Sequence, residues 1–150
     1  MEAYVRYGRA LFLAAQEAGE IESVKEDVDT ISASLEPFSD YSKLLDTPAL
    51  SREEKHSLVD AAFGTLGELS VNLLKILSDK CIFFAFSHIY GEYCRLYDLH
   101  HGIERVQAVT AYPMSDEQIK RLSVKLGELT GKRAVVENTV DPSVLGGVIL

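Results

Sequence analysis

This sequence contains no tryptophan, two cysteines and four prolines, and its positive charges are in the minority. Two cysteines are too few for a disulfide scaffold, and Cys81 and Cys94 lack the paired spacing of a zinc site, so we interpret both as reduced core residues. Fifteen lysines and arginines against 23 acidic residues give a net charge of −8. The electrostatic field of this net negative charge repels a phosphate backbone and does not attract anionic lipid, so nucleic acid is not expected as a partner.

A long apolar run is also missing. The longest, Cys81–Phe86 (CIFFAF), is far shorter than the roughly 20 residues that a membrane-spanning helix needs. No charged-then-apolar leader opens the chain, so we expect no direct membrane insertion and a protein that stays where it is made. With 47% hydrophobic residues among 150, the chain can bury a core, as one domain or as two small ones.

Apolar residues at three- and four-residue steps predict six helices in the first hundred residues. We expect them at about 3–18, 21–35, 39–45, 52–63, 68–80 and 80–100. Helices 3–18 and 68–80 are apolar over so wide an arc that each needs neighbours on more than one side, whereas helix 21–35 carries one stripe. Ser51 and Glu54 have the spacing of a capping box. Gly91 costs about 1 kcal/mol in a helix interior and weakens the prediction of one continuous last helix.

After Gly102 the pattern changes to that of strands. We expect a strand over 103–113 with a possible bulge near Glu104-Arg105, a helix from the capping box Ser115/Gln118 to Gly131, a strand over 132–140 and a third strand in the closing GVIL. The predicted fold class is mainly α: a six-helix bundle of residues 1–104 followed by a small α+β domain of residues 105–150.

Three parts of the sequence are candidates for catalytic chemistry. GELTGKR at 127–133 resembles a phosphate loop, but three residues separate Gly127 from Gly131 where four are required, and Arg133 stands where a Ser or Thr should be. His100-His101 lack a third ligand or a nucleophile at recognisable spacing. The acidic pairs Glu53-Glu54 and Asp116-Glu117 fall in first helical turns, where negative charge is favourable. We predict no catalytic residue, cofactor or metal site, and keep an enzyme using the histidine or acidic pairs as a weaker alternative.

The surplus apolar surface of helices 3–18 and 68–80 has two interpretations. It is either a groove that receives an amphipathic helix of a partner, or the centre of this chain's own bundle. The residues alone leave both open.

Longer stretches resemble a known family. VRYGRALFLAA, LLDTPALSREEKHSLVDAAF, NLLKIL and above all VTAYPMSDEQIKRLSVKLGELTGKRAVVENTVDPSVLGGVIL are similar to the delta subunit of rotary ATP synthases, which in mitochondria is called the oligomycin-sensitivity-conferring protein. The similarity covers nearly the whole chain, and the last forty or so residues are its most specific part.

The resemblance implies a non-catalytic stator connector. Such a subunit holds the N-terminal helices of α subunits on the catalytic head and joins them to b-type peripheral stalk subunits, so that rotor torque is resisted. It implies a groove for the α-subunit helix at Tyr7, Ala10, Leu11, Ala14, Leu73, Leu74 and Leu77. It also implies a C-terminal domain signature at Val140, Asp141, Pro142, Gly146 and Gly147. We interpret these residues first as determinants of the fold and only second as contact residues.

The chain departs from the family in two places. Relatives commonly have a Gly-Arg pair after the fifth helix, where this chain has Cys81-Ile82 and then Phe83-Phe84. The family's strand after the Gly-Gly pair also continues further, so we expect a C-terminally shortened chain whose second domain is less stable than its bundle. The expected location is the cytoplasmic face of a bacterial membrane, through other subunits. A free-standing helical adaptor for an unrelated amphipathic helix remains the alternative function.

Overall fold

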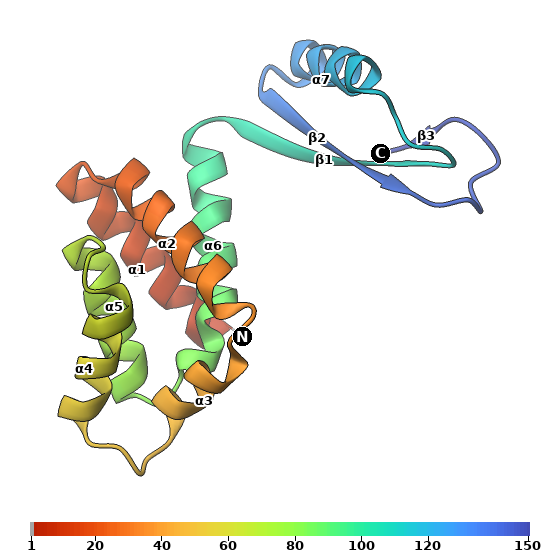
Figure 1. The fold of residues 1–150 in the computed structure, drawn as a ribbon. Helices are drawn as coiled ribbons and strands as arrows, with labels where there is room; N and C mark the ends of the chain where they lie inside the picture. Colours follow the sequence, from red (N-terminus) through yellow and green to blue (C-terminus); the bar gives the residue numbers. More distant parts are fainter. Residues whose placement is uncertain (1) are drawn as a thin grey trace. The chain divides into compact units, whose positions relative to one another are not determined.

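The computed structural model describes residues 2–150 and divides the chain into two compact units. Unit 1 extends to Tyr97 and unit 2 comprises Asp98–Leu150, so the division falls within a helix rather than between residues 104 and 105. Six α-helices precede a small sheet with one further helix (Figure 1). The predicted fold class, a helical bundle followed by a small α+β domain, is confirmed.

The helices of the bundle follow the predicted ranges closely. They are α1 Glu2–Ala18, α2 Ile21–Leu35, α3 Ser39–Asp46, α4 Arg52–Phe63, α5 Glu68–Asp79 and α6 Phe86–His100. The single stripe of α2 is buried through Val24, Val28 and Ile31. At the start of α4, the Ser51 hydroxyl accepts the backbone N–H of Glu54 at 3.1 Å, as the capping-box spacing predicted.

The last helix of the bundle begins later than predicted, at Phe86 instead of about residue 80. Cys81 has a positive φ of 54°, a conformation that an α-helix does not accept, and a short 3₁₀ turn, η1, follows at Phe83–Ala85. The Asp46 carboxylate accepts the N–H groups of Phe83 at 2.5 Å and Phe84 at 2.9 Å. These bonds satisfy the free donors of the turn, and Gly91 then lies inside a continuous α6.

Polar contacts hold the helices at defined positions around the apolar core. The Asp27 carboxylate accepts the Gly67 N–H at 3.0 Å and the Ser70 hydroxyl at 2.8 Å, which caps α5 from α2. The buried Tyr93 donates its hydroxyl to the Ile21 carbonyl at 2.8 Å. Gly8 lets α1 approach α6 so closely that a Cβ there would lie 2.7 Å from the Ile89 carbonyl oxygen. The mutual orientation of these helices is therefore tightly specified.

Unit 2 contains β1 Ile103–Thr110, α7 Asp116–Thr130, β2 Arg133–Val140 and β3 Val148–Ile149. The sheet order is β2-β1-β3, with β2 parallel and β3 antiparallel to β1. The β1–β2 register is unbroken from Ile103↔Arg133 to Thr110↔Val140, so the bulge considered near Glu104-Arg105 is wrong, and β1 ends at Thr110 rather than at residue 113. Both halves of the Ser115/Gln118 capping box are present, and Gly131 ends α7 with a φ of 70°.

Candidate binding surface

The predicted groove residues of α1 and α5 separate into core and surface. Leu74 and Leu77 are 0% exposed and Leu11 is 5% exposed, so these three side chains belong to the core of unit 1. Leu73, at 7% exposure, belongs to the same core cluster. Tyr7 and Ala14 are half-buried and Ala10 is exposed, so the structure brings three of the seven residues to the surface.

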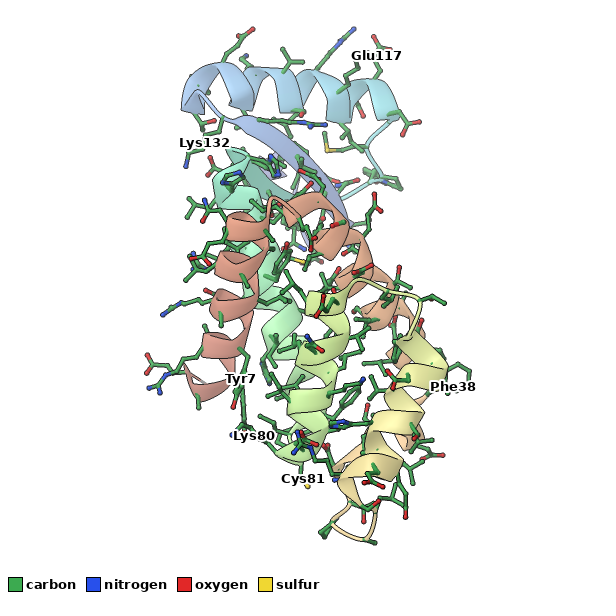
Figure 2. The ribbon with its side chains drawn as sticks, turned by 90° about the vertical axis from the view of Figure 1, so that its left-hand side faces the viewer. Tyr7, Phe38, Lys80, Cys81, Glu117 and Lys132 are labelled. Carbon is green, nitrogen blue, oxygen red and sulfur yellow. The ribbon has the colours of Figure 1, made fainter. Side chains whose placement is uncertain are left out.

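Helix periodicity shows which flank of α1 these residues occupy. Gly8 and Arg9 face α6, because Gly8 touches Ile89 and Arg9 pairs with the buried Glu92 at 3.2 Å. Tyr7, Ala10 and Ala14 follow one another at three- and four-residue steps, and they share a neighbouring flank of the helix. α1 also packs on α5, and the two helices run in opposite directions, with the beginning of α1 and the end of α5 at the same end of the bundle (Figures 1 and 2).

The flank of α5 that faces away from α4 carries two residues that the sequence analysis missed. Lys75 pairs with Asp60 of α4 at 2.9 Å and marks the α4 side of α5. Leu69, Leu73 and Ile76 follow one another at four- and three-residue steps on another flank. Ile76 is 44% exposed and Leu69 is half-buried. Their spacing was visible in the sequence, but α5 is apolar around so much of its circumference that periodicity could not select this flank.

Because α1 and α5 pack on each other, we treat these two flanks as one candidate surface, which we call the α1–α5 face. It consists of Tyr7, Ala10, Ala14, Leu69, Leu73 and Ile76. The alanines on α1 have short side chains that project little from this flank, so the backbone of a further helix can approach it closely. Leu73 and the half-buried Leu69 give it an apolar floor that is continuous with the core. This arrangement suits an amphipathic helix that inserts its apolar stripe between α1 and α5.

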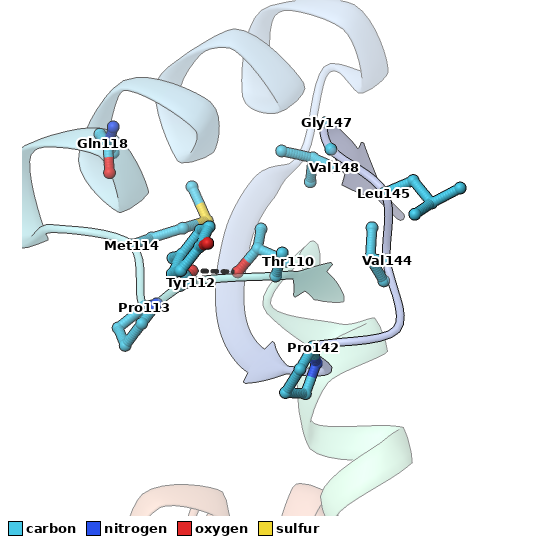
Figure 3. Close-up of a pocket in the computed structure, with 12 residues that line it drawn as sticks. Thr110, Tyr112, Pro113, Met114, Gln118, Pro142, Val144, Leu145, Gly147 and Val148 are labelled. Carbon is cyan, nitrogen blue, oxygen red and sulfur yellow. Dashed lines mark hydrogen bonds between the residues drawn. The ribbon is translucent and has the colours of Figure 1, made fainter.

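A second candidate surface lies in unit 2, around the predicted signature residues. A pocket of about 600 Å³ opens between the loop after β1 and the loop that precedes β3 (Figure 3). Its lining includes Thr110, Tyr112, Met114, Pro142, Leu145 and Gly147. Leu145 and Tyr112 are 105% and 83% exposed, so this rim presents large apolar groups to solvent.

The signature residues shape the loop that forms this pocket. The Asp141 carboxylate accepts the N–H of Ser143 at 3.0 Å and its hydroxyl at 2.7 Å, and these hydrogen bonds lower the pKa of Asp141. The Asp141 N–H donates to the Thr110 carbonyl at 2.8 Å. Gly146 and Gly147 have φ values of 125° and 79°, which favour glycine. Asp141, Gly146 and Gly147 therefore act on the backbone, while the loop exposes Leu145.

The residues considered for catalysis are separated in the structure. Glu53-Glu54 lie in the first turn of α4, Asp116-Glu117 in the first turn of α7, and His100-His101 at the end of α6. Within residues 2–150, no three histidine, cysteine or acidic side chains are grouped to hold a metal ion. Over the same residues, no helix has the length and apolar character to cross a membrane.

The comparison with known proteins decides the family. The sequence profile of the ATP synthase delta (OSCP) subunit matches residues 4–150, nearly the whole chain. This chain belongs to the ATP synthase delta (OSCP) subunit family. It is therefore a non-catalytic, stator-associated subunit of ATP synthase, as the resemblance implied, and the enzyme alternative is set aside on this ground.

Relatives within the delta subunit family support this assignment. The chain is 33% identical over 147 residues to the ATP synthase subunit delta of Xanthobacter autotrophicus, covering 97% of this chain and 73% of that protein. It is 34% identical over 146 residues to that of Alkaliphilus metalliredigens, covering 97% and 81%. A chain in the cryo-EM structure of the Toxoplasma gondii mitochondrial ATP synthase hexamer has the same fold, with a TM-score of 0.74, 21% identity and coverage of 97% of this chain and 83% of that chain.

Proposed function

We propose that this delta subunit connects the catalytic head of ATP synthase to the peripheral stalk. Unit 1 binds the N-terminal helix of an α subunit, and unit 2 binds the C-terminal end of a b-type stalk subunit. The connection is mechanical. Without it the catalytic head would rotate together with the rotor, and no mechanical work would reach the nucleotide-binding sites. In this proposal the subunit works at the cytoplasmic face of a bacterial cell membrane, to which it is attached through the other subunits; the bacterial origin of the similar proteins supports this location.

The observation that carries the first contact is the α1–α5 face. Exposed Ile76, together with the low surface of Ala10 and Ala14, gives an apolar strip that is bounded by two antiparallel helices and floored by Leu73. A helix in such a groove is held by an apolar stripe with i, i+3, i+4 and i+7 spacing, and its polar face stays in water. The buried Leu11, Leu74 and Leu77 support the groove from below and do not touch the bound helix.

Calorimetric titration of the full chain tests this contact. The ligand is a peptide of roughly 22 residues, about six helical turns, copied from the N-terminus of the same organism's α subunit. We expect saturable one-to-one binding that weakens at least tenfold in Ile76→Asp. Leu44→Asp is the matched control, because Leu44 is 43% exposed on α3 and Ile76 is 44% exposed. Equal binding by both variants, or no binding by the wild type, would contradict the proposal.

The stalk contact is carried by the apolar rim of the unit 2 pocket. Leu145 makes a good test position, since its side chain is fully exposed and its replacement removes no core packing. We expect Leu145→Asp to weaken binding of a peptide from the C-terminus of the b-type subunit. Val124→Asp, at a 56% exposed position on α7, is the control and should bind as the wild type does. If only Val124→Asp lost binding of the stalk peptide, the stalk contact would be assigned to α7 instead.

A further inference from the structure

A buried lysine and a cysteine meet within unit 1, where α4 packs beside the segment that follows α5. Lys55 on α4 is 3% exposed, and its Nζ donates hydrogen bonds to the Cys81 Sγ at 3.2 Å and to the Ser78 carbonyl oxygen at 3.2 Å. Cys81 immediately follows Lys80 at the end of α5 (Figure 2). The two residues are 26 positions apart, and their contact connects α4 to the segment that follows α5.

Lysine is rarely buried to this degree, and here the burial holds the amine against the sulfur. A long flexible side chain normally keeps its head in water. The polar contacts of Lys55 Nζ are a carbonyl oxygen and a thiol, while the nearby Asp79 carboxylate pairs with His56 at 2.8 Å and Arg52 at 3.3 Å. The amine and the thiol are thus preorganised toward each other by packing, which raises the effective concentration of one at the other.

Small molecules have access to the sulfur. Cys81 is partly exposed, and a cavity of about 240 Å³ opens beside it, lined by Pro48, Leu50, Arg52, Lys55, Asp79 and Cys81. This volume is ample for water or hydrogen peroxide. The positive φ of Cys81 is a conformation that side chains rarely adopt, and it turns the thiol out of the helical path of α5 toward α4.

We propose that Lys55 and Cys81 form an oxidation-dependent covalent crosslink between α4 and the segment that follows α5. Hydrogen peroxide oxidises the Cys81 thiol to a sulfenic acid, with transfer of one oxygen to sulfur and release of water. The Lys55 amine then attacks the sulfenic sulfur: a nitrogen–sulfur bond forms, the sulfur–oxygen bond breaks, and the hydroxyl leaves as water with one amine proton. The product is a sulfenamide, and excess thiol reverses it by attack on sulfur.

Mass spectrometry of the full chain tests the crosslink, on a Cys94→Ser background so that Cys81 is the single thiol. The folded protein is treated with hydrogen peroxide, quenched with catalase, denatured and alkylated. We expect a species that is not alkylated and is lighter by about 2 Da, the mass of two hydrogen atoms. Tryptic digestion should show cleavage blocked at Lys55 and its peptide joined to the one that contains Cys81. Dithiothreitol should restore the original mass and one alkylation site.

Two lysine variants separate the crosslink from ordinary oxidation. Lys55→Arg keeps the positive charge but removes the amine, so it should yield oxygen adducts at Cys81 and no species lighter by two hydrogens. Lys80→Arg, next to Cys81 in sequence and exposed, should crosslink as the parent does. The proposal is overturned by oxygen adducts alone in the parent, by a fully alkylated Cys81, by an oxygen-retaining bridge, or by loss of the link in Lys80→Arg. Peptide mapping of the parent decides the matter even if Lys55→Arg fails to fold.

Discussion

The Asp27 carboxylate on α2 caps the first turn of α5 through the backbone N–H of Gly67, at 3.0 Å. The same oxygen accepts the hydroxyl of Ser70, a residue that is 1% exposed. A helix N-terminus leaves several N–H groups without intrahelical partners, and here a residue forty positions earlier in the chain supplies the acceptor. The cap therefore also fixes where α2 lies against α5.

Removal of this cap should destabilise the bundle. Asp27→Ala takes away the acceptor for both donors, and we expect the free energy of unfolding to fall by about 1–2 kcal/mol. Glu26→Ala is the control, because Glu26 is the neighbouring acidic residue and is exposed. Urea denaturation followed by circular dichroism measures the difference. Equal stability of the two variants would show that the cap contributes nothing beyond charge.

Two glycines in the bundle should respond in opposite directions to alanine. At Gly8 a Cβ would meet the Ile89 carbonyl oxygen at 2.7 Å and Glu92 Cβ at 2.9 Å, so Gly8→Ala should push α1 from α6 and cost about 1–3 kcal/mol. At Gly91, inside α6, a Cβ meets nothing within 4 Å, so Gly91→Ala should stabilise by about 0.5–1 kcal/mol. Thermal and urea unfolding test both, and a shift of the same sign in both variants would contradict the packing described for α1.

Stability should decline in alkaline solution because of buried tyrosines. Burial raises the pKa of Tyr41 from 10.0 to about 12, and burial also raises the pKa of Tyr90 and Tyr93. Above pH 10 the unfolded chain releases phenolic protons that the folded protein retains. The free energy of unfolding is therefore highest below pH 10 and falls as the pH rises toward 12. Urea midpoints measured from pH 8 to 11.5 check this, and Tyr41→Phe should flatten the decline. A midpoint that stays constant above pH 10 would contradict it.

Unit 2 should be cleaved before unit 1 in limited proteolysis. Among its described residues few side chains are buried, namely Ala108, Thr110 and Ala134, and α7 contributes none of them. Few buried contacts mean a low free energy of local opening. We expect early cuts within residues 106–150 and a resistant fragment of about residues 1–105, identified by mass spectrometry. Equal resistance of both regions would contradict the prediction.

The helices were predictable because their signals are local. Ser51 and Ser115 mark helix starts through spacing alone, and the stripe of α2 follows from period 3.6. The beginning of α6 was not predictable, since it depends on Asp46 reaching Phe83 and Phe84 from thirty-seven and thirty-eight positions away. No local pattern reports a positive φ at a cysteine.

The sequence predicted which two helices, α1 and α5, carry the candidate surface, but not which flank of α5 faces solvent. Apolar residues cover so much of α5 that Leu73, Leu74, Ile76 and Leu77 are equivalent in the sequence. Burial separates them, with Leu74 and Leu77 at 0% and Ile76 at 44% exposure. Which flank faces solvent depends on where α4 and α1 pack, and that is a property of the tertiary structure. The assignment of the face to an α-subunit helix stays a prediction.

The parallel pairing of β1 with β2 makes the length of their connection a structural constraint. Every pair joins residues thirty positions apart, from Ile103 with Arg133 to Thr110 with Val140. One deletion between the strands, if the loops do not absorb it, shifts all eight pairs together and turns each side chain of β2 to the opposite face of the sheet. In evolution, gains and losses of single residues are therefore expected to collect in the loops at either end of α7, where they can be absorbed without a shift of the strand register.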